Sequence, residues 1–137
     1  MSFGMKSALL AAAVGLGSPA LAQGTYPSRP ITLVVAYPAG GGADITARVG
    51  TPFLEKYFGQ SVVVENIGGA SGAIGAMKVA SATPDGYPYL FGTTNEMIVT
   101  PLVNPSTRYR VTDFEQVALI ARSTAVLFGR TGLPFDS

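Results

Sequence analysis

The sequence predicts an α/β fold in which a mostly parallel sheet carries helices on both faces. Runs of β-branched residues alternate along the chain with segments whose apolar residues recur at helical spacing. Glycine clusters follow the first two of these runs, as expected where strands turn into helices. Of the 137 residues, 47% are hydrophobic and 12% are charged, which favours a buried core over disorder. A β-α-β-α-β order with right-handed crossovers then makes the strands parallel.

Residues 1–22 have the pattern of a secretory signal peptide. Lys6 precedes an apolar run over 8–17, and Ala20 to Ala22 form an A-x-A cleavage pattern. A membrane anchor is the alternative, but the apolar run is shorter than the roughly 20 residues needed to cross a bilayer. We therefore expect an exported, periplasmic chain that begins at Gln23.

The first two expected elements are a strand over 31–36 and a helix over 43–58. The strand is a continuous run of β-branched and apolar residues, which is typical of a strand buried on both faces. The helix has a stop signal at Gly59, and Pro52 lies inside it. Because proline removes a backbone hydrogen bond at a cost of about 3 kcal/mol, we expect a kink or break near residues 50–51.

Two more strands and a second helix complete the expected β-α-β-α-β order. A strand over 61–65 is followed by a helix over 72–82, which must end before Pro84. An Asp-Gly turn then leads into a third strand over 87–92.

The rest of the chain is less regular. We expect a short helix over 96–103, a loop over 104–112 and two further strands over 115–120 and 124–129. Residues 135–137 have the composition of a helix N-terminus, so we expect the chain to be incomplete.

Composition and charge exclude several classes of function. Nine Lys and Arg against eight Asp and Glu give a net charge of +1, without the basic field that nucleic acid requires. Because the chain lacks Cys and His, thiol nucleophiles, imidazole bases and soft-metal sites are excluded, although oxygen ligands for a hard metal remain. We expect no catalytic residue, no cofactor, no bound metal and no nucleic-acid partner.

Three loops carry the candidate binding residues, because ligands bind at the carboxyl ends of the strands in such sheets. The first loop, 38–44, places glycines at a helix start, where free amides and the helix dipole favour an anion. Asp44 is either a helix-start acid stabilised by that dipole or a residue that positions a water or a polar ligand group. The second loop, 66–72, offers Ser71 near a helix start. The third, 93–95, carries short polar side chains that either contact a ligand or cap the next helix.

Two nucleotide-binding motifs fit the glycine loops less well. A P-loop requires Lys followed by Ser or Thr after the glycines, and none follows here. A dinucleotide fingerprint has its G-x-G spacing at Gly40 and Gly42 and an acid at Glu65, but Ile45 occupies the third glycine position. A nucleotide-dependent enzyme fragment with a degenerate Rossmann glycine loop is therefore the alternative function.

The chain resembles the periplasmic substrate-binding receptors of tripartite tricarboxylate transporters, the Bug family. The similar segments follow one another in the family's order and at its spacing. They are YPSRPITLVVAYPAGGGADITAR (26–48), GQSVVVENIGGASGAIGA (59–76), ATPDGYPYLFGT (82–93) and the weaker TDFEQVALIA (112–121).

The resemblance implies a two-lobed fold of the type II periplasmic-binding-protein kind, without catalysis. Its cleft would hold a small carboxylate or related solute and deliver it to the permease subunits of a membrane transporter. Residues 23–137 would then form an incomplete N-terminal lobe, with 113–137 leading toward the hinge and a missing second lobe.

The same resemblance places the ligand contacts on the three loops. In the family, the first and second loops grip one ligand carboxylate through amides, an acid and ordered waters, and the third loop faces the cleft. The corresponding candidates in this sequence are Gly41, Gly42, Ala43, Asp44, Ser71, Gly72, Thr93, Thr94 and Asn95.

We expect the exported chain to lack residues 1–22, because signal peptidase cleaves after a small residue such as Ala22. Intact-mass measurement on protein recovered from the periplasm should give a chain that begins at Gln23. Replacing Ala22 with Lys should block this processing. A full-length chain found in the cytosol would contradict both the cleavage site and the location.

Overall fold

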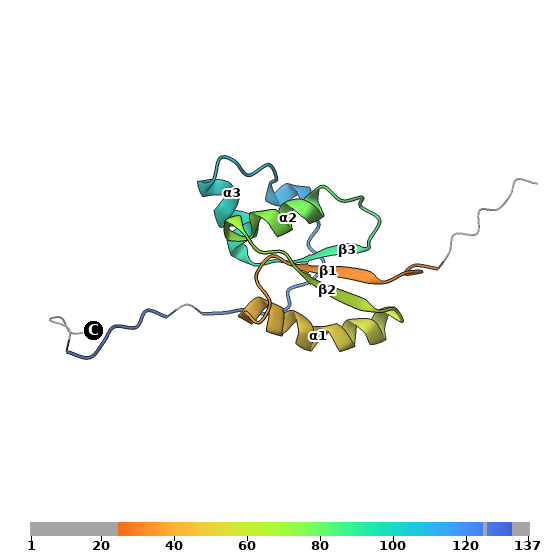
Figure 1. Ribbon diagram of the computed structural model, residues 1–137, viewed down its shortest axis with the longest axis horizontal. Coiled ribbons are helices and arrows are strands. Elements are labelled where there is room, and N and C mark those ends of the chain that lie inside the picture. Colours follow the sequence, from red (N-terminus) through yellow and green to blue (C-terminus); the bar gives the residue numbers. More distant parts are fainter. Residues whose placement is uncertain (1–24, 125, 133–137) are drawn as a thin grey trace, which may run out of the picture.

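Three parallel strands form the sheet of this protein, in the order β2-β1-β3 (Figure 1). The computed structural model describes residues 25–124 and 126–132, so the expected signal peptide and the end of the chain at 135–137 lie outside the described residues. Ile31 lies opposite Val62, and Thr32 lies opposite Pro88. The strands are β1 (Ile31–Val35), β2 (Val62–Asn66) and β3 (Pro88–Phe91).

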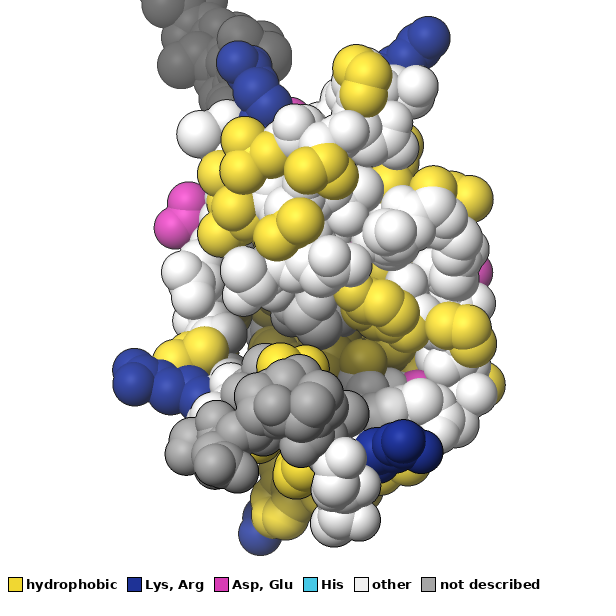
Figure 2. Space-filling view, turned by 90° about the vertical axis from the view of Figure 1, so that its left-hand side faces the viewer, with side chains coloured by type: hydrophobic (Ala, Val, Ile, Leu, Met, Phe, Trp, Pro, Cys, Tyr) yellow, Lys and Arg dark blue, Asp and Glu magenta, His cyan; other side chains and the backbone are white. Residues whose placement is uncertain are grey.

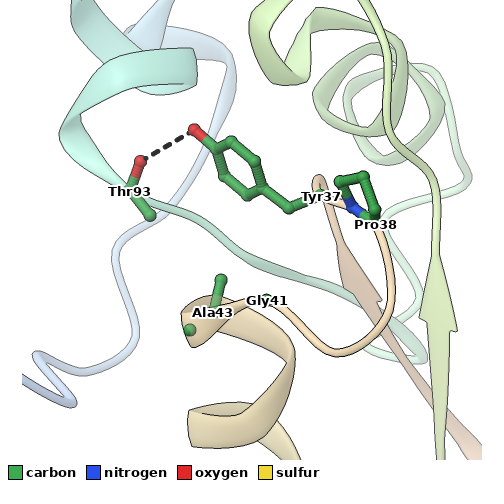
Figure 3. Close-up of a pocket in the computed structure, with 6 residues that line it drawn as sticks. Tyr37, Pro38, Gly41, Ala43 and Thr93 are labelled. Carbon is green, nitrogen blue, oxygen red and sulfur yellow. Dashed lines mark hydrogen bonds between the residues drawn. The ribbon is translucent and has the colours of Figure 1, made fainter.

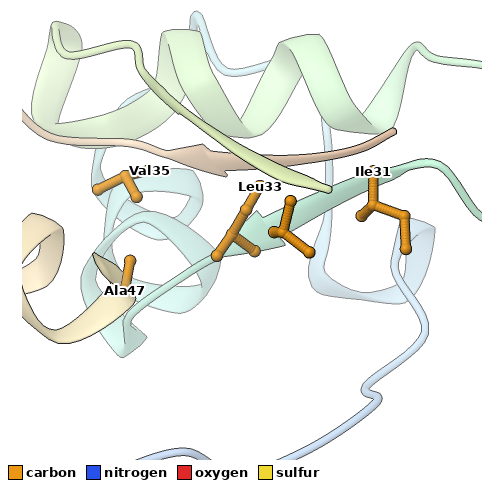
Figure 4. Close-up of a cluster of buried hydrophobic side chains, with 5 residues drawn as sticks. Ile31, Leu33, Val35 and Ala47 are labelled. Atoms are coloured by element: carbon orange, nitrogen blue, oxygen red, sulfur yellow. The ribbon is translucent and has the colours of Figure 1, made fainter. Parts of the chain in front are cut away.

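Helices cover both faces of the sheet, as the sequence predicts. Helix α1 (Gly42–Phe58) lies on one face, and α2 (Ala73–Ala80) lies on the other (Figure 1). Successive side chains of a strand point to opposite faces, so a central strand covered on both sides is mostly apolar. In β1 only Thr32 is polar, and it is partly buried. The core on the α1 face is made of Ile31, Leu33, Val35, Ala47 and Val62 (Figure 4).

Short helical segments occupy the chain around the third strand. A single 3₁₀ turn, η1 (Ala70–Gly72), precedes α2. After β3, a π-helical turn, η2 (Asn95–Val99), continues into α3 (Thr100–Val103), which confirms the helix expected over 96–103. A second 3₁₀ turn, η3 (Val111–Asp113), follows the loop.

Helix α1 runs without a break through Pro52, so of the kink or break expected near residues 50–51 the break is wrong. Proline leaves the carbonyl oxygen of Arg48 without its helical donor. Arg48 and Pro52 are both exposed, so water can satisfy that oxygen. Meanwhile Ala47 and Leu54 pack on the sheet and hold the helix together across this position.

The two strands expected over 115–120 and 124–129 are also wrong. Within the described residues neither segment is paired, and Figure 1 shows the chain passing the sheet and then leaving it. Val117 and Leu119 expose 73% and 62% of their surface. A strand needs a partner for its backbone and a surface for its side chains, and this part of the chain finds neither among the described residues.

Replacing Gly75 with Ala should destabilise the chain by about 1–3 kcal/mol, because the added methyl group overpacks the contact between α2 and the sheet. A Cβ at this position would lie 2.8 Å from the carbonyl oxygen of Ile67 and 2.9 Å from the Cα of Ala36. The matched control is Gly50→Ala within α1, where a Cβ would meet nothing within 4 Å. Urea unfolding should show a loss for the first variant and no loss for the second, and equal midpoints would contradict the close contact.

Candidate functional site

A hollow of about 400 Å³ opens at the carboxyl ends of β1 and β3. Figure 2 views the molecule from this end and shows hydrophobic side chains within the hollow. Its lining comes from the first loop and from the start of the third, so the fold brings these two predicted loops together. The lining residues are Tyr37, Pro38, Gly41, Gly42, Ala43 and Thr93 (Figure 3).

One side of the hollow is the N-terminus of α1. Gly41 is the N-cap residue of this helix. Because glycine has no side-chain oxygen, it cannot accept a hydrogen bond from the amides of the first turn. None of the described residues accepts a hydrogen bond from the backbone N–H of Gly42 or Ala43. These amides therefore face solvent as free donors and carry the positive end of the helix dipole.

Asp44 is buried directly behind this donor surface. Its carboxylate accepts hydrogen bonds from Arg48 Nε at 2.9 Å, from the Gly40 backbone N–H at 2.8 Å and from Asn66 Nδ2 at 2.9 Å. Asn66 in turn donates to the carbonyl oxygen of Tyr37 at 3.2 Å. Asp44 does not line the hollow; it fixes the loop whose amides do.

The partners of Asp44 also set its charge. The side-chain hydrogen bond from Arg48, followed by those from Gly40 and Asn66, lowers the pKa of Asp44 to about 2. The carboxylate is therefore ionised across the whole physiological range, with its charge balanced by Arg48.

The second loop lies beside the third loop and not on the lining of the hollow. The carbonyl oxygen of Ser71 accepts hydrogen bonds from Thr100 Oγ1 at 3.1 Å and from Asn95 Nδ2 at 3.4 Å. Gly72 is buried, with φ of 87°, and a Cβ there would lie 2.7 Å from the Cβ of Glu96. Ser71 and Gly72 thus support the third loop from behind, and direct contact of these two residues with a ligand stays a prediction.

The third loop supplies the opposite side of the hollow. The hydroxyl oxygens of Thr93 and Tyr37 lie 3.2 Å apart, and Figure 3 shows them above Gly41 and Ala43. Asn95 Nδ2 donates to the Tyr37 hydroxyl oxygen at 3.2 Å. Thr94 is exposed at the start of the following helix.

Several residues of the site were not among the sequence-based candidates, and Tyr37 and Glu96 matter most for its polar contacts. Glu96 is fully buried, and its carboxylate accepts hydrogen bonds from the Tyr37 hydroxyl at 2.7 Å, the Thr93 hydroxyl at 2.6 Å and the Thr93 backbone N–H. The signal for Glu96 is present in the sequence, because Thr93 and Glu96 have the S/T-x-x-E spacing of a capping box. Nothing comparable marks Tyr37. Among the described residues, no three Asp, Glu, Cys or His side chains are grouped as a metal site would require.

The family model that describes a tripartite tricarboxylate transporter family receptor matches residues 46–137. The chain belongs to this family. Over 127 residues it is 40% identical to a UPF0065 protein of Agrobacterium vitis, covering 92% of this chain and 36% of that protein. It is 37% identical to BugT of Bordetella pertussis over 92% of this chain and 39% of BugT. The chain thus spans a little over a third of the length of these receptor-family relatives.

Solved structures agree with this assignment. MatC from Rhodopseudomonas palustris, solved with bound malate, matches with a TM-score of 0.66 and 36% identity over 69% of this chain and 33% of MatC. A second structure, of a periplasmic transporter, matches with a TM-score of 0.60 and 44% identity over 63% of this chain and 29% of that one. The described residues therefore form part of a periplasmic-binding-protein-like domain, and the receptor-family match gives no support to the Rossmann enzyme alternative.

Asp44→Asn should weaken the dependence of folding stability on pH below pH 5. Because the pKa of Asp44 is lowered from 3.8 to about 2 in the folded chain, the unfolded state binds more protons there as the pH falls. The resulting stabilisation is present above the unfolded pKa and is lost as the pH falls toward 2. Urea unfolding between pH 2 and pH 6 should therefore give a steeper loss for the wild type than for the variant.

The control for this measurement is Glu65→Gln. Glu65 pairs with Lys78 at 2.6 Å, and both side chains are about half exposed, so this surface ion pair contributes little to stability. The stability of Glu65→Gln should therefore depend on pH as that of the wild type does. Identical profiles for the wild type and Asp44→Asn would contradict the role given to Asp44.

Proposed function

We propose that this chain forms one wall of the binding site of a periplasmic receptor that captures a small carboxylate or related solute. The observation that carries the proposal is the free N-terminus of α1 in the hollow, with the unpaired amides of Gly42 and Ala43. An anion placed there accepts hydrogen bonds from both amides and is stabilised by the helix dipole. A volume of about 400 Å³ suits a small organic acid.

Each predicted site residue has a part in this proposal. Gly42 and Ala43 present the backbone donors, Gly41 lines the hollow as the N-cap residue of the helix, and Asp44 holds their loop in place. Thr93, Thr94 and Asn95 form the facing loop, which Ser71 and Gly72 support from behind. The malate bound in the related structure of MatC supports a carboxylate as the ligand of the present chain.

The proposal includes location and partners. Family membership supports a receptor without catalytic activity that delivers its solute to the permease subunits of a tripartite tricarboxylate-type transporter. Processing of residues 1–22 and export to the periplasm belong to the same proposal, as does the assignment of 23–137 to the first lobe, with 113–137 leading toward a hinge. Among the described residues, no helix is both long and apolar enough to cross a membrane.

Gly42→Val should abolish carboxylate binding without unfolding the chain. A Cβ at Gly42 meets nothing within 4 Å, so the new side chain projects into open space at the entrance to the amides. We expect malate to shift the NMR signals of the Gly42 and Ala43 amides in the wild type and to leave them unchanged in the variant. Gly50→Val, at a position in the same helix with equally open space, should bind as the wild type does.

The affinity of the 137-residue chain alone should be millimolar or weaker. The hollow is open to solvent, and binding must still offset a loss of translational and rotational freedom of about 4 kcal/mol or more. Shifts that are absent at every malate concentration, or that persist unchanged in Gly42→Val, would refute the proposed site.

A further inference from the structure

Glu96 is a buried carboxylate that the proposed carboxylate site does not use directly. It lies beneath the third loop with none of its surface exposed, and a carboxylate can only accept hydrogen bonds. Among the described residues, two that line the hollow provide every donor to the Glu96 carboxylate. These donors are the hydroxyl of Tyr37 and the hydroxyl and backbone N–H of Thr93.

These contacts fix the direction of the hydrogen bonds on this side of the hollow. A hydroxyl group has a single proton, and the Tyr37 and Thr93 oxygens also lie 3.2 Å from each other. Because the Glu96 carboxylate is nearer to both hydroxyls and is the stronger acceptor, each hydroxyl donates its proton to Glu96. Asn95 completes the pattern, because its Nδ2 donates to the Tyr37 hydroxyl oxygen and its backbone N–H donates to Thr93 Oγ1 at 3.2 Å. Each hydroxyl oxygen accepts one of these bonds and retains one lone pair.

The orientation of the Asn95 amide is fixed in the same way. Its Nδ2 also donates to the carbonyl oxygen of Ser71, which can only accept. With Nδ2 committed to Tyr37 and Ser71, the Oδ1 of Asn95 is a further acceptor on the exposed loop.

We infer that Glu96 sets the hydrogen-bond polarity of the site, so that the Tyr37–Thr93 wall of the hollow presents acceptors while the α1 wall presents donors. Glu96 touches no ligand and acts through Tyr37 and Thr93, as a positioning residue. This inference rests on the proposed carboxylate site.

The opposed polarities select a class of ligand. A carboxylate matches the amides of Gly42 and Ala43, and a hydroxyl group on a neighbouring carbon matches the acceptors of Tyr37 and Thr93. A second carboxylate turned toward Tyr37 and Thr93 finds only acceptors, with the charge of Glu96 behind them, and is rejected. The site therefore favours a hydroxycarboxylate over the same acid without its hydroxyl group.

Malate and succinate test the inference, because they differ only by one hydroxyl group. Both are titrated into the isotope-labelled chain, and the NMR shifts of the Gly42 and Ala43 amides give the two dissociation constants. We expect malate to bind about fivefold more tightly than succinate, as one additional neutral hydrogen bond allows. In Glu96→Gln, the glutamine amide can donate to the hydroxyl oxygens and release their protons toward the hollow, so the ratio should fall to about one, in line with the loss of that bond.

Glu65→Gln makes the same chemical change at the exposed ion pair with Lys78 and should keep the wild-type ratio. If circular dichroism shows that Glu96→Gln does not fold, Thr93→Val and Tyr37→Phe replace it in the test. Each of these variants removes one acceptor and should lower the ratio of malate to succinate affinity. A purely structural role for Glu96 would weaken both ligands equally and leave the ratio unchanged.

The possible results separate the two proposals. Equal affinity of the wild type for malate and succinate overturns the inference about Glu96 and leaves the carboxylate site standing. A preference for malate that persists in Glu96→Gln, or in both of the other variants where Glu96→Gln does not fold, overturns it as well. No shift of the amides with either acid overturns the carboxylate site and the inference together.

Discussion

The carboxylate of Asp44 connects the loop after β1, helix α1 and the end of β2. It binds the Gly40 amide in the loop after β1, Arg48 one turn further along α1, and Asn66 at the end of β2. Asn66 extends the network to the carbonyl oxygen of Tyr37. The loop after β1 is rich in glycine and has little preference for one conformation. Because Asp44 and Asn66 hold both of its ends, this network restricts the loop that begins α1.

The alternation of elements could be predicted from the sequence as far as α3, because each of those elements has its own local signal. The run of β1 reflects faces that are buried in the described residues. The spacing along α1 predicts the helix but not its buried face, because Leu54 and Phe58 pack on the core while Ile45, Val49, Phe53 and Tyr57 are exposed. The prediction was wrong where local pattern and packing disagree. Residues 115–120 have the composition of a strand, but strand formation requires a paired neighbour, which no local pattern can supply. At Pro52 the loss of a backbone hydrogen bond does not break the helix, because solvent can satisfy the carbonyl oxygen of Arg48.

The candidate site also has a part that the sequence predicts and a part that it does not. The glycine loop and the polar loop after β3 were predicted to lie together because parallel strands bring their carboxyl ends to one edge, and the hollow lies between them. What no spacing shows is which polar atoms face the hollow. Asp44 is the helix-start acid of the first interpretation, and its carboxylate is used by Gly40, Arg48 and Asn66. Its positioning of a water or a polar ligand group stays a prediction. Glu96 lies 52 residues beyond Asp44 along the chain, and its contact with Gly72 in the second loop comes from packing that no spacing predicts.

The donor wall and the acceptor wall of the proposed carboxylate site depend on the sequence in different ways. The donor wall is made of backbone amides, so it requires only that the helix begins here and that no side chain covers Gly42. The acceptor wall consists of the side chains of Tyr37 and Thr93, and its polarity depends on Glu96. A substitution on the first wall either leaves carboxylate binding intact or blocks it. A substitution on the second changes which carboxylate fits, while the amides go on binding the charge. In the proposed site, the fold of the α1 N-terminus therefore supplies the affinity for an anion, and the side chains around Glu96 supply the choice among anions.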